Sequence, residues 1–351
     1  MLRNERKDID LWEKLDILIN KLPLPFRIVY DSLRIFLLEH CTIRATALAY
    51  TSLLAVVPLM ILLSSISLSL GVGELFIAHL PVLLPEILEK VLPYINHILH
   101  LLSLDNAIDL NAMTDLILEN VMPFLIQAQG ISLGSLGIIG GLGLLVTFIL
   151  AIDTIESNMN IVWGVNETRG YGQKAAIFIP FLLLFAGGIA ICGVLLHYMQ
   201  SVLENILTHS LSFGKFGEFL LDLSIPTVLL SFALAGLWAL YCYMPYVPSD
   251  YGFWRAFIEK TKRRWFPAVI STAFTYGAIF GFITAMIFVM ASMFAKWSLF
   301  YGSLAVFPMI MFLLFGFWCI ILFGNALCWR ITVRNHPKTY FLRRIKKLST
   351  H

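Results

Sequence analysis

The sequence has few charged residues, and its last part has no acidic ones at all. Only 13% of the 351 residues are Asp, Glu, Lys or Arg, whereas a soluble domain has roughly 25%. Every acidic residue lies at or before Glu259, so the chain from Lys260 onward carries positive charge only. Because 59% of the residues are hydrophobic and the mean hydropathy is +0.82, the composition excludes an ordinary soluble domain. It is typical of a polytopic membrane protein.

Motifs for catalysis, metal binding and disulfides are also missing. The five cysteines form no Cys-x-x-Cys pair, which favours small buried side chains over disulfides or metal ligands. The charged N-terminus does not match a cleaved signal peptide. No Gly-rich phosphate loop, His-rich metal motif or serine nucleophile elbow occurs. We therefore expect no catalytic residue, no metal, no cofactor and no enzymatic activity.

Long apolar runs dominate the rest of the chain. A helix needs about 20 residues to cross the ~30 Å hydrocarbon core. Pro58 lies inside the first run, where it removes one helix hydrogen bond and predicts a kink or a gating hinge that faces protein. The predicted fold class is all-α, with six transmembrane helices, N-terminal amphipathic helices and a helical extracytoplasmic cap between the first two spans. The predicted spans are about 45–70, 131–152, 175–199, 224–244, 267–294 and 302–329.

Segments outside these runs predict the remaining organisation. Pro23 and Pro25 divide the N-terminal segment into two amphipathic helices, which we expect along the membrane face or against the bundle. The cap has seven acidic residues and apolar residues at helical spacing. The predicted division is 1–42 for the cytoplasmic amphipathic helices, 43–335 for the membrane domain with its cap at 71–130, and 336–351 for a basic cytoplasmic tail.

Lysine and arginine predict the orientation. Of 25 such residues, 22 lie in the N-terminal segment, the 153–174 and 245–266 loops and the C-terminal segment. The positive-inside rule then places both termini in the cytoplasm. A basic cluster in the 245–266 loop is expected to anchor the chain and to contact anionic lipid. Nucleic-acid binding is not expected, since no folded soluble module surrounds it. The cluster consists of Arg255, Lys260, Lys262, Arg263 and Arg264.

The second apolar run continues, without Pro or Gly, into a polar stripe. Asp153, Glu156, Asn160 and Trp163 fall on one helical face. Carboxylates at membrane depth are costly and often functional. The stripe either meets headgroup water beyond the bilayer edge or points at partner helices. Other polar residues fall within predicted spans, among them Tyr50 and Asn325.

Three motifs resemble those of the YihY/BrkB family of bacterial inner-membrane proteins, formerly labelled ribonuclease BN. The first is Ala47-Leu-Ala-Tyr50-Thr-Ser-Leu-Leu-Ala-Val-Val-Pro58-Leu, and the second has Glu156, Asn160 and Trp163. The third begins Tyr301-Gly302 and reaches Pro308. The family often has an acid near the end of the sixth helix, where this chain has Asn325. The 245–266 loop of this chain is also longer than the loop usual in the family.

The resemblance implies six spans, cytoplasmic termini, an inner-membrane location and a role in the envelope. The leading hypothesis is a transporter or lipid-handling protein whose polar path passes Tyr50, Glu156 and Asn160. The second is a non-transporting envelope scaffold. The ribonuclease is disfavoured, because a metal-dependent nuclease needs clustered carboxylates or histidines. Membrane lipids are the expected partners, and the sequence leaves open a homo-oligomer and a small-molecule or lipid substrate.

Overall fold

The computed structural model is helical throughout the parts of the chain that it describes. These are residues 23–69, 133–165, 167–174, 230–231, 233–246, 253–301 and 306–333. The predicted all-α class is confirmed for these residues. The long helices are α2 (Leu24–Leu38), α3 (Cys41–Ser69), α6 (Leu133–Val162), α9 (Phe253–Tyr301) and α10 (Val306–Thr332), and a shorter apolar helix covers Ala233–Tyr243.

Helices suited to a bilayer are present within this part of the chain. Thr261–Met286 in α9 and Ile310–Thr332 in α10 are each long and apolar enough to cross a membrane. α3 and α6 run as unbroken helices through the first two predicted spans. The cap at 71–130, the span at 175–199 and both terminal segments (1–22 and 336–351) lie outside the described residues. The six-span topology and the domain division therefore stay predictions.

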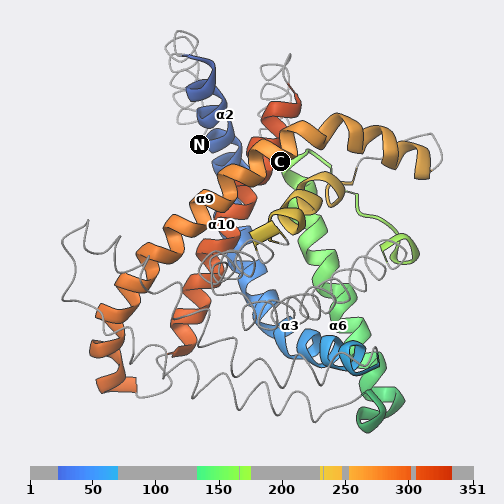
Figure 1. Cartoon of the computed structure of the whole chain (residues 1–351), viewed down its shortest axis with the longest axis vertical. Coiled ribbons are helices and arrows are strands. Elements are labelled where there is room, and N and C mark those ends of the chain that lie inside the picture. The colour runs from blue at the N-terminus through green and yellow to red at the C-terminus, as the bar shows by residue number, and fades with distance from the viewer. Residues whose placement is uncertain are drawn as a thin grey trace, which may run out of the picture.

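Helix α10 occupies the centre of the described structure. It packs against α9, α3, α2 and α6, and Figure 1 shows α9 crossing it diagonally. Its inward residues Leu322, Ala326 and Cys328 are completely buried. Gly324 provides a close approach, because a Cβ there would collide with the side chains of Thr275 and Tyr241. The core thus gathers around the second half of α10, and it also positions the polar residues described below.

Several helix boundaries differ from those expected. α9 begins at Phe253 and continues through Pro267, so the loop predicted at 245–266 is wrong from residue 253 onward. No Pro or Gly stands between Phe253 and Pro267, and one Pro removes only one hydrogen bond from a long helix. α3 likewise continues through Pro58. In α10, Pro308 lies in the first turn, where a missing N–H has no intrahelical partner to lose.

Helix α2 exposes an apolar stripe and buries a mixed face that includes charged residues beside Ile35 and Phe36. Phe26 is 65% exposed and Leu37 53%, and Val29 and Leu33 between them are also exposed. Asp31, by contrast, is 6% exposed, and Ser32 and Arg34 are also buried. In water this would be the wrong side out, but hydrocarbon reverses the preference. The exposed apolar stripe of α2 is compatible with its predicted place along the membrane, which stays a prediction.

Candidate functional site

The two central residues of the polar stripe of α6 lie inside protein. Because no helix-breaking residue intervenes, α6 runs from its apolar segment directly into the stripe and ends at Val162. Glu156 is 0% exposed and Asn160 1%, so neither side chain reaches surrounding solvent or lipid. Of the two alternatives left open by the sequence, the stripe takes the second and points at neighbouring segments.

Glu156 is held by two cations. Its Oε1 accepts hydrogen bonds from the backbone N–H of Arg169 at 3.2 Å and from Nη1 of Arg169 at 3.0 Å. Its Oε2 lies 3.7 Å from Nζ of Lys174, which also pairs with Asp153. Desolvation by burial lowers the pKa of Arg169, and the charge of Glu156 acts in the opposite direction. We call Asp153, Glu156, Arg169 and Lys174 the charge cluster, in which two negative charges balance two positive ones.

Arg169 also joins the cluster to the turn after the helix Ala233–Tyr243. Its Nη1 donates to the carbonyl of Met244 at 2.9 Å and its Nη2 to that of Tyr243 at 2.7 Å. The guanidinium lies 5.4 Å from the ring centre of Tyr246, a cation–π distance. One buried arginine therefore links α6, its own segment and this turn.

Asn160 connects the same three segments through its amide. Its Nδ2 donates to the carbonyl of Glu167 at 2.9 Å, and its Oδ1 accepts from the backbone N–H of Tyr246 at 2.7 Å. Both polar atoms of the amide are thus used to satisfy backbone groups. This arrangement gives Asn160 a structural role in holding the segments together.

Trp163 brings α9 and α10 into the same assembly. Its indole N–H donates to Oδ1 of Asn325 at 2.9 Å, and Nδ2 of Asn325 donates to the carbonyl of Met159 at 3.0 Å. The guanidinium of Arg264 lies 4.1 Å from the ring centre of Trp163 and donates to the carbonyl of Pro245 at 2.7 Å. Asn325 thereby fixes the end of α6 to α10.

The predicted site residues are therefore only partly brought together. Glu156, Asn160, Trp163 and Asn325 share one assembly. Tyr50 on α3 is 57% exposed, and no hydrogen bond joins it to these residues in the described part of the chain. The predicted polar path is not a continuous line of side chains here. Of the third motif, Tyr301 is the last residue of α9 but its side chain is not described, Gly302 lies outside the described residues, and Pro308 is exposed.

The residues of the predicted basic cluster are also only partly found where they were expected. Lys262 and Arg263 are exposed, as expected for lipid anchors. Arg264 is 4% exposed and turned onto Trp163, so in this structure it does not lie at the surface. Arg255 and Lys260 belong to α9, but their side chains are outside the described residues.

Sequence reasoning missed the cations that neutralise Glu156. Arg169 and Lys174 are the only basic residues of the 153–174 segment, which also contains three acidic residues, Asp153, Glu156 and Glu167. Two basic residues close in sequence to these carboxylates, beside an apolar run, could have pointed to buried pairs. Asp31 and Arg330 were also missed. They form a second buried pair between α2 and α10, with Nε of Arg330 2.6 Å from Oδ2 of Asp31.

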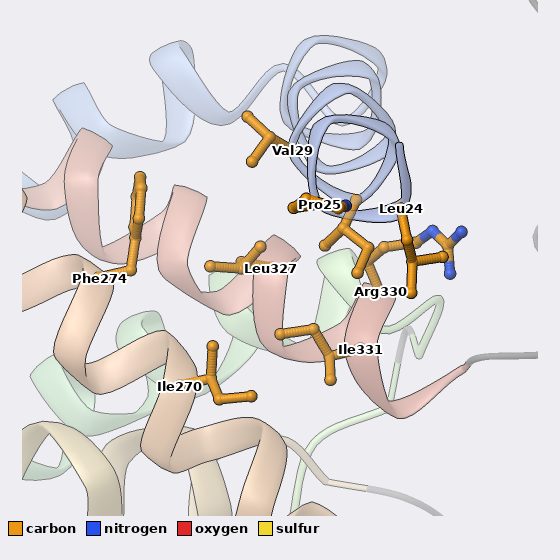
Figure 2. A pocket seen from close by; sticks show the side chains of 9 residues that line it. Leu24, Pro25, Val29, Ile270, Phe274, Leu327, Arg330 and Ile331 are labelled. Carbon is orange, nitrogen blue, oxygen red and sulfur yellow. The ribbon is translucent and has the colours of Figure 1, made fainter. Parts of the chain in front are cut away.

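A groove adjoins this second pair. It has a volume of about 510 Å³ and lies between α2, α9 and α10 (Figure 2). Arg330 is the charged residue in its lining, and the other lining residues are apolar: Leu24, Pro25, Ile28, Val29, Ile270, Phe274, Leu327 and Ile331. Within the described residues no three His, Cys, Asp or Glu side chains are grouped as metal ligands would be.

Together these features define an all-α membrane protein in which a network of buried charges and amides fastens the ends of several helices. The chain belongs to the virulence factor BrkB family, whose model matches residues 33–343. It is similar to a UPF0761 membrane protein of Acinetobacter baylyi, with 27% identity over 329 residues that cover 92% of this chain and 67% of the relative. No solved structure matches the chain. The resemblance to this family expected from the three sequence motifs is confirmed.

Proposed function

We propose that this chain is a lipid-handling protein of the bacterial inner membrane and not an enzyme. The observation that carries the proposal is the groove between α2, α9 and α10. It is lined almost entirely by apolar side chains, and its volume falls within the roughly 300–1,000 Å³ range of small-molecule sites. An apolar groove in contact with a bilayer is filled by acyl chains in preference to water.

The surroundings of the groove support the same proposal. The outer stripe of α2 is apolar, and Val29 belongs both to that stripe and to the groove lining. On α9, Ile270 and Phe274 line the groove and are 39% and 42% exposed. A lipid could therefore enter from the side, between the two helices, without crossing the charge cluster. In this proposal the charge cluster keeps the ends of the helices in place and does not touch the lipid.

Native mass spectrometry of the protein purified in a mild detergent tests this function. We expect wild type to retain lipid and Ile270→Trp to lose it, because the indole fills the groove. Ile283→Trp is the matched control, since Ile283 is 41% exposed on the same helix and does not line the groove. Equal lipid retention by all three proteins would remove the groove from the function.

The same measurement distinguishes lipid handling from the scaffold hypothesis. If the purified protein retains no lipid but a partner protein co-purifies with it in a fixed ratio, that result would favour a non-transporting envelope scaffold. Six spans with both termini in the cytoplasm are part of the proposal, and they would place the Arg330 end of the groove on the cytoplasmic side.

A further inference from the structure

The groove has one charged residue in its lining, and its position suggests a headgroup site. Figure 2 shows the guanidinium of Arg330 beside Leu24, at the first turn of α2, with Leu327 and Ile270 further along the groove. Arg330 is only 4% exposed, so burying its charge is expensive unless it is paired. A long apolar surface that ends at a buried cation matches the two parts of a phospholipid.

Asp31 orients the guanidinium without using all of it. The pair is formed by Nε of Arg330 and Oδ2 of Asp31, and no hydrogen bond of the two terminal nitrogens falls within the described residues. A guanidinium held by one edge still has donors in a planar fork, which suits the oxygens of a phosphate.

The local charge also favours an anion. The charged residues of α2, its C-cap and α10 are Arg27, Arg34 and Arg330 against Asp31 and Glu39, three positive and two negative. The first turn of α2 has no acidic residue, and Pro23 provides no side-chain cap. Within the described residues, no acidic side chain of the first turn and no capping side chain neutralises the positive end of the helix dipole.

We propose that the groove binds an anionic phospholipid, with its phosphate at Arg330 and the first turn of α2 and one acyl chain along Ile28, Ile270 and Leu327. This inference rests on the proposed function and names the class of lipid that the same site selects. A zwitterionic lipid offers the same chain, but its own cation competes with Arg330 for the phosphate. Charge complementarity thus decides between lipids that the apolar lining alone would not distinguish.

The test compares the binding of phosphatidylglycerol and phosphatidylcholine to delipidated protein in mixed micelles, by native mass spectrometry. We expect wild type to prefer phosphatidylglycerol at least about tenfold, because the choline cation of phosphatidylcholine offsets the phosphate charge that attracts Arg330. Arg330→Gln alone would leave Asp31 buried and unpaired, so the main variant is Asp31→Asn/Arg330→Gln, which removes both charges and keeps both shapes. It should bind the two lipids equally. Ile283→Gln, which changes an exposed residue of α9 outside the groove, should keep the preference.

The outcomes separate this inference from the proposed function. Equal binding of both lipids by wild type, or a preference unchanged in the double variant, would overturn the headgroup assignment while lipid handling stands. If wild type binds neither lipid, both proposals fail. Displacement of phosphatidylglycerol by equimolar inorganic phosphate would show a site for a soluble anion and would also overturn the assignment.

Discussion

Glu156 shows why an acidic residue at the end of an apolar helix does not by itself indicate a proton or substrate site. Its carboxylate faces Arg169 and Lys174, and its surface is completely buried. A buried pair adds little net stability when complete, but removing one partner is costly because the other charge is left unpaired. Glu156 of the second motif therefore contributes to the stability of the fold, and its place in a motif does not by itself show a functional role.

At this scale we predict that Glu156→Gln lowers the free energy of unfolding by about 3 kcal/mol, the usual cost of leaving a buried charge unpaired. Asp153→Asn is the matched comparison. Asp153 pairs with the same Lys174 but its side chain is 34% exposed, so water replaces part of the lost interaction and a smaller effect is expected. Thermal unfolding in detergent, followed by intrinsic fluorescence, measures both. Equal stability of the three proteins would show that the charge cluster is not buried as described.

A second residue-scale prediction concerns Trp163. Trp163→Phe keeps an aromatic ring under Arg264 but removes the donor to Asn325, which leaves a buried oxygen without a partner. The expected loss of stability is about 1–3 kcal/mol. Trp265→Phe serves as the control, because Trp265 is 55% exposed. A larger loss in the control than in Trp163→Phe would contradict the prediction.

The elements show which parts of the fold the sequence could predict. α6 was predictable to its end at Val162, because nothing interrupts its helical pattern and the polar stripe has a 3.6-residue period. Its partners were not predictable. The carbonyl of Glu167 and the N–H of Tyr246 meet Asn160 only after two separate segments have folded back. The apolar stripe of α2 was also visible in the sequence, but periodicity alone does not tell whether that stripe faces core or lipid.

Two glycines on neighbouring elements make the packing of α10 testable. Gly324→Ala would place a methyl group against Thr275 and Tyr241, and overpacking of this kind costs about 1–3 kcal/mol. At Gly277 on α9, an added Cβ meets nothing within 4 Å among the described residues. Gly277→Ala should therefore be neutral or slightly stabilising, because alanine is the better helix former by about 1 kcal/mol. Differential scanning calorimetry of the two purified variants should show a lower melting temperature for Gly324→Ala than for Gly277→Ala. Similar melting temperatures would contradict the close approach at Gly324.

For the whole molecule, the sequence predicted membrane residence from composition and orientation from lysine and arginine. The described structure adds helices of suitable length. The buried network has a bearing on the orientation. Asn160 and Arg169 fasten the segment after α6 to the turn at Tyr246, so these two connections lie at the same end of the bundle.

This common end gives a topology prediction. In a variant without native cysteines, a single cysteine at exposed Tyr171 and another at exposed Arg263 should both react with a membrane-impermeant maleimide in inside-out vesicles. Neither should react in spheroplasts. Labelling of the two positions from opposite sides would contradict the shared end of the bundle, whereas labelling of both in spheroplasts only would reverse the predicted orientation.

The pair between Asp31 and Arg330 joins residues 299 positions apart in the chain. During synthesis, Asp31 leaves the ribosome long before the arginine that neutralises it has been made. Until then α2 can lie on the membrane through its apolar stripe, but it lacks the cation that stabilises its inner face. Its docking must therefore wait until α10 is complete, and the groove that α2 closes exists only in a nearly finished chain. A protein that stops short of Arg330 would keep its early helices yet have no groove in which to hold a lipid.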